Sequence, residues 1–115
     1  MPGRHRRRPD VLPGDREILG QLAAKLREVE PRARIWAFGS RARGTAHPDS
    51  DFDVCVVVPV FSEELEKRII HTAWEIAFEH GLVIPPVVLS EESFERGPMS
   101  ASTLVANILR EGIAA

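Results

Sequence analysis

Two aspartates, Asp51 and Asp53, stand two positions apart where a polar segment meets the apolar run 54–58. If this run is a strand, alternation points both side chains to one face, with Cα atoms about 7 Å apart. Two carboxylates so placed repel each other when ionised, and a divalent cation between them removes that conflict. Oxygen-only ligation suits Mg²⁺ or Mn²⁺, which bind one or two carboxylates together with waters and the phosphates of a nucleotide. We therefore predict a metal site at Asp51 and Asp53.

A second polar cluster begins at Gly39 and Ser40, where the apolar run 33–38 ends. Gly39 permits close backbone approach to a ligand, and Ser40 adds a hydroxyl donor. The letters SRAR from Ser40 onward could start a short helix whose N–H groups accept a phosphate. Arg41 and Arg43 could meet triphosphate oxygens, or they could be solvent-facing loop charges. Together with the aspartate pair, this cluster has the ingredients of metal-assisted phosphoryl transfer.

Hydrophobic periodicity predicts the elements that position these clusters. The predicted helices cover 15–30, 63–81 with Ser62 as the cap, and 101–112, and the predicted strands cover 33–38, 52–58 and 82–90. Asp15 is the expected N-cap of the first helix. Pro85 and Pro86 interrupt the third strand, which is therefore expected near a sheet edge and regular from Val87 onward. This order predicts one α/β (α+β) domain, a small sheet covered by helices.

Several apolar side chains are assigned to the core from their spacing. The buried stripe of the last helix is expected to be Leu104, Val105, Ile108 and Leu109. Trp74 and Phe78 lie on an adjoining face of the long helix and are expected in the core, with a partner-binding surface as the alternative. Cys55 is expected to be a small buried hydrophobe rather than a reactive thiol.

The composition limits the class of protein. The chain has 115 residues, 43% of them hydrophobic, and a net charge of -2, which excludes binding of nucleic acid by overall charge. Residues 1–14 are predicted to be a flexible basic arm and residues 15–115 the domain. The arm leaves a small RNA-binding module as one alternative, although nucleic acid is not the expected main ligand. No apolar run is long enough for a membrane span or a secretory signal, so a cytoplasmic location is expected.

The motif GSRARG followed by SDFD resembles that of the DNA polymerase β-type nucleotidyltransferase superfamily, and particularly its minimal nucleotidyltransferases (MNT), the partners of HEPN-domain proteins. The resemblance covers about residues 15–112. It implies a nucleotidyltransferase-like small mixed sheet covered by helices. It also implies that Gly39 and Ser40 bind the β and γ phosphates of ATP or another nucleoside triphosphate, and that Asp51 and Asp53 bind Mg²⁺.

The function implied by this resemblance is transfer of a nucleoside monophosphate, AMP from ATP, to a hydroxyl of a partner macromolecule. The partner would be a HEPN toxin, so that the chain would act as an antitoxin. Family enzymes carry a third carboxylate on the strand after the long helix, where this chain has Pro85, Pro86 or Val87. Glu91 or Glu92 could replace it from the following turn. The alternative function is a catalytically degenerate, nucleotide-binding domain that neutralises or scaffolds a HEPN-type partner by binding alone.

Overall fold

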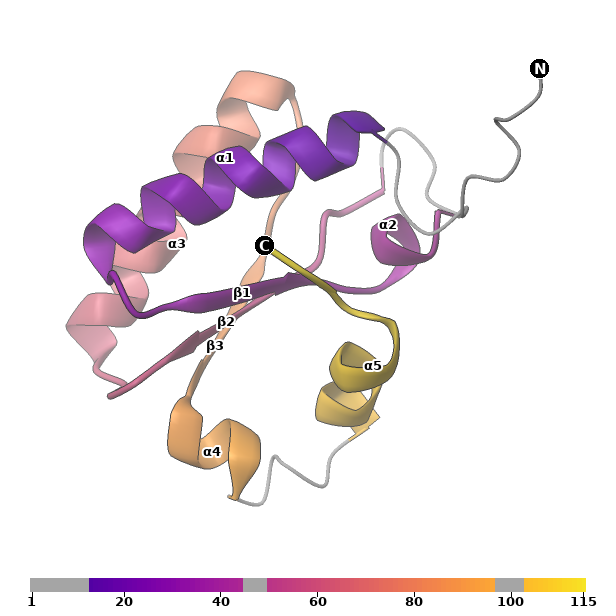
Figure 1. Ribbon diagram of the computed structural model, residues 1–115. Helices are drawn as coiled ribbons and strands as arrows, with labels where there is room; N and C mark the ends of the chain where they lie inside the picture. Colours follow the sequence, from indigo (N-terminus) through magenta and orange to yellow (C-terminus); the bar gives the residue numbers. More distant parts are fainter. Residues whose placement is uncertain (1–12, 45–49, 97–102) are drawn as a thin grey trace.

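The computed structural model describes residues 13–44, 50–96 and 103–115 (Figure 1). Helices and strands alternate in this part of the chain, except that two helices follow each other before the last strand. In chain order they are α1 (Pro13–Val29), β1 (Arg34–Ala37), α2 (Ser40–Arg43), β2 (Val54–Val58), α3 (Glu63–His80), β3 (Pro86–Ser90), α4 (Glu91–Glu95), α5 (Thr103–Glu111) and β4 (Ile113–Ala114).

The strands form one mixed sheet in the order β3-β2-β1-β4. β1 is antiparallel to both β2 and β4, whereas β2 and β3 are parallel. Helices α1 and α3 cover one face of the sheet, and α4 and α5 lie on the other (Figure 1). The predicted small mixed sheet covered by helices is confirmed, as is the expectation that the proline-containing strand lies at an edge.

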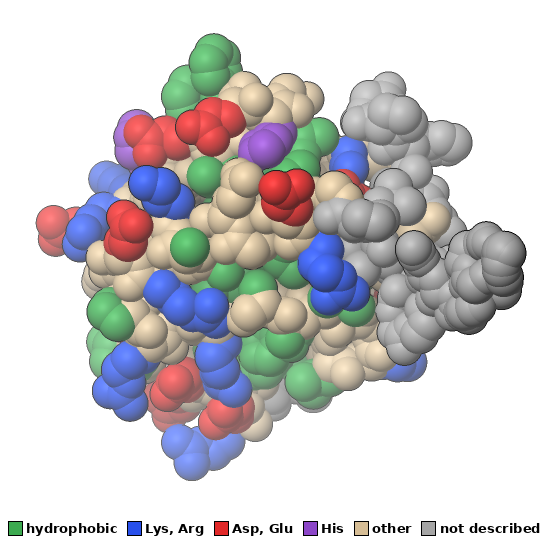
Figure 2. Space-filling model, turned by 45° about the horizontal axis from the view of Figure 1, so that its top comes forward, with side chains coloured by type: hydrophobic (Ala, Val, Ile, Leu, Met, Phe, Trp, Pro, Cys, Tyr) green, Lys and Arg blue, Asp and Glu red, His purple; other side chains and the backbone are tan. Residues whose placement is uncertain are grey.

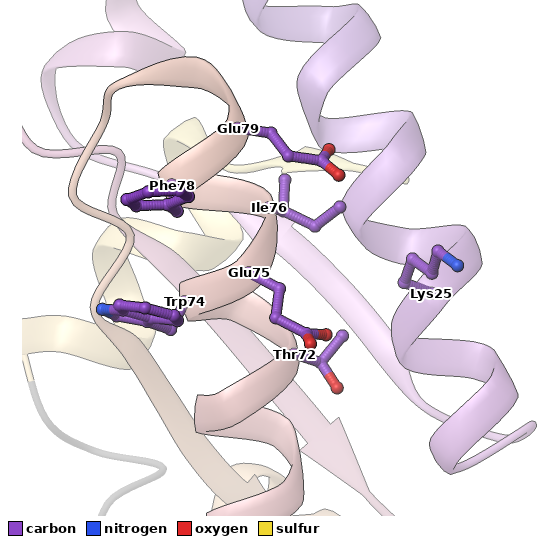
Figure 3. A pocket seen from close by; sticks show the side chains of 7 residues that line it. All are labelled: Lys25, Thr72, Trp74, Glu75, Ile76, Phe78 and Glu79. Atoms are coloured by element: carbon purple, nitrogen blue, oxygen red, sulfur yellow. The ribbon is translucent and has the colours of Figure 1, made fainter.

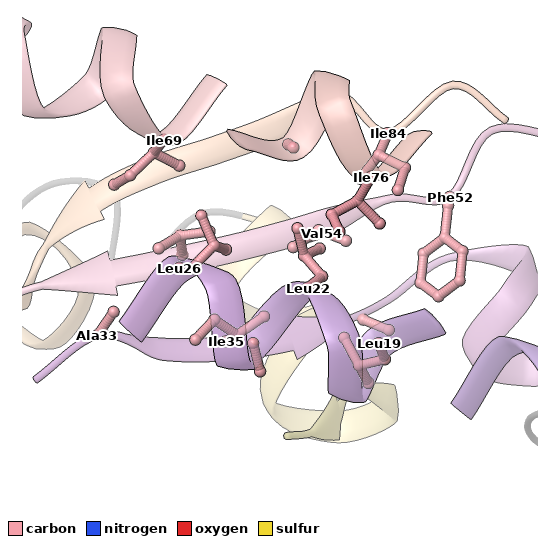
Figure 4. Close-up of a cluster of buried hydrophobic side chains, with 14 of the residues drawn as sticks. Leu19, Leu22, Leu26, Ala33, Ile35, Phe52, Val54, Ile69, Ile76 and Ile84 are labelled. Atoms are coloured by element: carbon pink, nitrogen blue, oxygen red, sulfur yellow. The ribbon is translucent and has the colours of Figure 1, made fainter. Parts of the chain in front are cut away.

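The central strand β2 is buried on both faces, which explains its unbroken apolar sequence. Val54, Val56 and Val58 belong to the cluster beneath α1 and α3 (Figure 4). Cys55 and Val57 belong to the second cluster, beneath α4 and α5. Burial raises the pKa of the Cys55 thiol to about 12. The expected role of Cys55 as a buried hydrophobe is therefore confirmed.

The long helix α3 has the ends that its sequence indicates. The Ser62 side chain accepts a hydrogen bond from the Leu65 backbone N–H at 3.1 Å. At the other end Gly81 adopts φ 65°, ψ 34°, the left-handed conformation that glycine adopts without strain. Both ends lie where local capping signals predict them, because a cap depends on residues that are neighbours in the chain.

Helix α1 begins earlier than predicted. It starts at Pro13, so Asp15 lies inside the first turn and is buried, and the predicted N-cap role of Asp15 is wrong. The predicted arm lies outside the described residues except for its last two, Pro13 and Gly14, which begin α1. None of the helices in the described part of the chain combines the length and the hydropathy needed to cross a bilayer.

Two predictions about the core are wrong. Leu109 is 65% exposed, because α5 turns Val105 and Ile108 toward the sheet and leaves the next position outside. Trp74 and Phe78 are 61% and 74% exposed, because α3 packs inward through a different face. The buried residues of that face are Ile69, Ala73, Ile76 and Ala77.

Candidate active site

The antiparallel pairing of β1 and β2 brings the two polar clusters together. Ala37, the last residue of β1, pairs with Val54, the first residue of β2. One residue beyond this pair, the Phe38 backbone N–H donates to the carbonyl oxygen of Asp53 at 3.0 Å. The chain that leaves β1 therefore lies beside the chain that enters β2. Sheet register, rather than closeness in sequence, places Gly39 next to Asp53.

Gly39 occupies a position where a side chain would not fit. Its backbone has φ 78° and ψ -155°, a region that is essentially restricted to glycine. A methyl group at this position would lie 2.6 Å from Oδ2 of Asp53, well inside van der Waals contact. The Asp53 carboxylate thus lies directly against the turn that leads into α2, where Ser40 is the first helical residue.

Burial and the nearby Asp51 carboxylate oppose the ionisation of Asp53. Asp53 is half-buried, and this burial is the main cause that raises its pKa above the ordinary value. The neighbouring Asp51 carboxylate raises the pKa further, whereas Arg43 lowers it. Asp51 itself is exposed. The two carboxylates are therefore close enough to repel each other, as the strand spacing predicts.

This arrangement fits a cation that arrives together with a nucleotide. Within residues 13–44, 50–96 and 103–115, no group of three or more His, Cys, Asp or Glu side chains could hold a metal ion by itself. Mg²⁺ is commonly bound by one or two carboxylates, with substrate phosphates and waters completing its shell. Asp51 and Asp53 supply two carboxylates, and a cation between them would relieve the repulsion that raises the pKa of Asp53.

β3, the parallel neighbour of β2, carries no third carboxylate. β2 and β3 are parallel, and Val54 pairs with Pro86, so Pro85 stands level with Asp53. The five residues of β3 are Pro86, Val87, Val88, Leu89 and Ser90. None of them has an acidic side chain, so the structure supplies no acid beside Asp53 from this strand.

Glu91 and Glu92, the possible replacements for this carboxylate, lie at the opposite end of the strands from Asp53. They follow Ser90, which pairs with Val58, the last residue of β2. Glu91 and Glu92 form the first turn of α4, where negative charge is favoured by the helix dipole. The Ser90 hydroxyl caps this helix by accepting from the Ser93 N–H at 3.0 Å.

The Arg41 side chain is buried and donates hydrogen bonds to acceptors within the protein. Its side chain is 6% exposed, and one terminal nitrogen donates to Oδ1 of Asp15 at 2.9 Å. The other donates to the carbonyl oxygen of Ser50 at 2.8 Å. The guanidinium carbon also lies 5.6 Å from the centre of the Phe52 ring. Arg41 is therefore not the solvent-facing charge of the alternative prediction, and its fork is directed at protein acceptors rather than outward to a triphosphate.

Arg43 has a different setting. Its side chain is 49% exposed and pairs with Glu111 of α5 at 3.1 Å. It also lowers the pKa of Asp53. Arg43 therefore carries its charge at the surface beside the carboxylate pair, where an incoming phosphate could compete with Glu111.

The acidic partners of these arginines, Asp15 and Glu111, are not among the site residues that the motifs predict. A signal for Asp15 was present, because it continues the helical spacing of the buried residues Leu19, Leu22 and Leu26. A charge on the apolar stripe of a helix requires a buried partner. The signal for Glu111 is weaker: it lies three positions after the buried Ile108, at the end of α5, and its side chain is 28% exposed.

The chain belongs to the nucleotidyltransferase domain family, whose profile matches residues 19–114. No curated protein is similar enough in sequence to count as a relative. The matched range begins in α1 and ends in β4, so it includes the whole sheet and both polar clusters.

Among solved structures, the fold is similar to that of two mutants of the toxin–antitoxin pair MntA–HpeT. The TM-scores are 0.58 and 0.59, at 20% and 22% sequence identity. The alignments cover 83% and 84% of this chain and 69% of the other chain in each case. At this level of identity the likeness shows a shared fold.

Proposed function

We propose that this chain transfers AMP from ATP to a hydroxyl group of a partner protein and releases pyrophosphate. The observation that carries the proposal is the contact between the Asp53 carboxylate and Gly39, with Asp51 beside it, in a chain of the nucleotidyltransferase domain family. A phosphate chain bound at the turn would meet a cation bound at the carboxylates. Both parts of a metal-assisted phosphoryl transfer would then share one site.

Each residue of the site has a role in this proposal. Gly39 and Ser40 would hold the β and γ phosphates at the start of α2. Asp51 and Asp53 would hold Mg²⁺ or Mn²⁺, which supplies charge neutralisation for the phosphates when it is bound. Arg43 would exchange its ion pair with Glu111 for a contact with a phosphate oxygen.

The proposed partner is a HEPN-type toxin, and the proposed role is that of the antitoxin. The fold shared with MntA–HpeT supports this proposal. A second support is the outer face of α3, where Trp74 and Phe78 are exposed and stack with ring centres 5.5 Å apart. Unpartnered aromatic surface of this kind is enriched where proteins bind one another.

The surroundings of these aromatic rings mix apolar and charged groups. Trp74 and Phe78 project from one side of α3, while Glu75 and Glu79 project toward α1, and together they line a pocket of 330 Å³ (Figure 3). Figure 2 shows one face of the molecule, on which basic and acidic side chains lie among hydrophobic ones. We therefore propose that the face of α3 that carries Trp74 and Phe78 contributes to binding of the partner.

The activity is tested with α-labelled ATP, Mg²⁺ and a HEPN protein encoded beside this chain. We expect label on the partner with the natural chain and none with Asp53→Asn, which keeps the shape of the side chain but loses its charge. Glu92→Gln, an acid at the far end of the strands, is the matched control and should transfer label normally. Equal labelling by the natural chain and Asp53→Asn would overturn the proposed site.

A second candidate function is neutralisation of the partner by binding alone. The observation that favours it is the proline that stands level with Asp53, where family enzymes carry a third carboxylate. In this case the partner would remain unlabelled, and its inhibition would persist with Asp53→Asn. The variant Trp74→Ser with Phe78→Ser would then abolish inhibition, while Leu109→Ser, an exposed apolar residue on α5, would not.

A further inference from the structure

The buried ion pair between Asp15 and Arg41 has an unusual cost for a small domain. The two side chains are 8% and 6% exposed, so both charges have left most of their water. Such pairs commonly contribute less to stability than apolar residues of similar volume would. In addition, Oδ2 of Asp15 has no hydrogen-bond partner among the described residues. Stability alone therefore does not account for this pair.

What the pair does is connect the segments that form the site. Arg41 belongs to α2, two residues after Gly39, and Asp15 belongs to α1. The second arm of the guanidinium reaches the Ser50 carbonyl, at the start of the segment that carries both aspartates. The same guanidinium lies over the ring of Phe52, between those aspartates in the chain. One side chain of α2, the helix that follows the Gly39–Ser40 turn, thus contacts both α1 and the segment that carries the two aspartates.

The planar shape of arginine matters for this connection. Its two terminal nitrogens donate at the same time to Oδ1 of Asp15 at 2.9 Å and to the Ser50 carbonyl at 2.8 Å. A lysine at this position has one terminal nitrogen on a flexible stem and cannot reproduce the fixed fork. The distance between the two acceptors is therefore set by a rigid group rather than by loop conformation.

We propose that Arg41 is a positioning residue, held by Asp15, that fixes the Gly39–Ser40 turn relative to Asp51 and Asp53. The proposal rests on the proposed function for the role of these residues in nucleotide transfer. It assigns Arg41 a role other than phosphate ligand. The protein keeps a buried charge pair at this point because a small displacement between phosphate and metal groups lowers the rate steeply.

The test separates positioning from stability by replacing the pair with apolar residues. In the full chain, Asp15→Leu combined with Arg41→Met removes both charges and should leave the protein folded, with a free energy of unfolding similar to that of the natural chain. Amide hydrogen exchange is followed at Phe38 and Phe52, whose N–H groups donate to the Asp53 and Val83 carbonyls. We expect hydrogen exchange at both amides to become about tenfold faster, because a tenfold change corresponds to the loss of about one hydrogen bond to a charged group.

The same variant is titrated with MgATP at a temperature where it is fully folded. We expect the affinity of this variant for MgATP to fall about tenfold, because the hydrogen bonds of Arg41 are lost. The matched control is Arg34→Met with Glu95→Leu, an exposed pair with the same 2.9 Å separation in β1 and α4. The control should change neither the exchange at Phe38 and Phe52 nor the affinity. Unchanged exchange and affinity in the Asp15–Arg41 variant would overturn the proposal.

Two outcomes need separate treatment. If the double variant does not fold, Arg41→Lys is measured instead, and unchanged exchange at Phe38 and Phe52 in that variant overturns the proposal. If the natural chain binds no MgATP, the proposed function fails, and the exchange measurement alone decides whether Arg41 positions the two segments.

Discussion

The two ends of β2 both have acidic residues nearby, yet their surroundings differ. At the entry to the strand, Asp53 lies against Gly39 and beside Asp51, and its pKa is raised. At the exit, Glu91 and Glu92 lie in the first turn of α4, where the helix dipole stabilises negative charge. The negative charges at the exit are therefore stabilised by an element of the fold, helix α4. Those at the entry remain in mutual repulsion, which is the setting that a bound cation would stabilise.

The ion pairs show the same difference. Arg41–Asp15, near the entry, and Arg34–Glu95, near the exit, have equal separations of 2.9 Å. The first pair is 6% and 8% exposed and the second 41% and 52%. Exposed pairs are screened by solvent and contribute little, whereas a buried charge that loses its partner is costly. Of these two pairs, the one whose disruption is costly therefore lies at the end of β2 where the two polar clusters meet.

The largest expected effect is on catalysis, from removing one charge at the entry to β2. Asp53→Asn should lower the rate of AMP transfer about a thousandfold, because charge stabilisation by a catalytic metal is worth several kcal/mol. The double variant Glu91→Gln with Glu92→Gln should transfer at the natural rate. Initial rates with α-labelled ATP measure both. A similar loss in the two variants would remove the distinction between the ends of the strand.

The next effect is on stability. Arg41→Ala should lower the free energy of unfolding by about 3–5 kcal/mol, because it leaves the Asp15 carboxylate buried without its partner. Arg34→Ala should cost less than about 1 kcal/mol, since its pair is exposed. Urea unfolding followed by circular dichroism gives both values. Equal costs would mean that burial does not distinguish the two pairs.

A smaller effect is expected from two glycines with positive φ. Gly81→Ala should cost about 1 kcal/mol, since φ is 65° and the structure has nothing within 4 Å of the added methyl group. Gly39→Ala should cost about 2–3 kcal/mol, because the backbone is strained and the methyl group also meets the Asp53 carboxylate. Thermal unfolding compares them. If Gly39→Ala were the milder change, the contact with Asp53 would have no consequence.

The smallest effect is a pH dependence. Because burial and Asp51 raise the pKa of Asp53 above 3.8, the folded state holds this proton more tightly than the unfolded state. Between the unfolded and folded pKa values, stability of the metal-free protein therefore falls as pH rises. Asp53→Asn lacks this decline, so its stability relative to the natural chain should increase through that window. Urea unfolding with a chelator between about pH 3 and pH 7 tests this, and parallel curves for the two proteins would contradict it.

Local signals in the sequence predict much of this fold. Ser62 and Gly81 define α3 because caps depend on adjacent residues, and the apolar run after Asp53 defines β2. The exposure of Trp74 and Phe78 could not be predicted, because it depends on which face of α3 contacts α1. Spacing along a helix identifies apolar stripes but not the stripe that is covered.

The relation between sites is also a tertiary property. Glu91 and Glu92 are near Pro85 and Pro86 in the chain, yet the extended strand β3 separates them. Because β3 is parallel to β2, the prolines lie near Asp53 and the glutamates lie at the opposite end of β2. Conversely, Asp15 and Arg41 are far apart in the chain and form one buried pair. Sequence motifs identify candidate residues, whereas register and helix packing decide which of them meet.

The most direct test of the central claim is a crystal structure of the chain with Mn²⁺ and a non-hydrolysable ATP analogue, using anomalous scattering to locate the metal. We expect Mn²⁺ between the carboxylates of Asp51 and Asp53, with the β and γ phosphates against Gly39 and Ser40. Nucleotide and Mn²⁺ bound together at any other place on the protein would contradict the site proposed here.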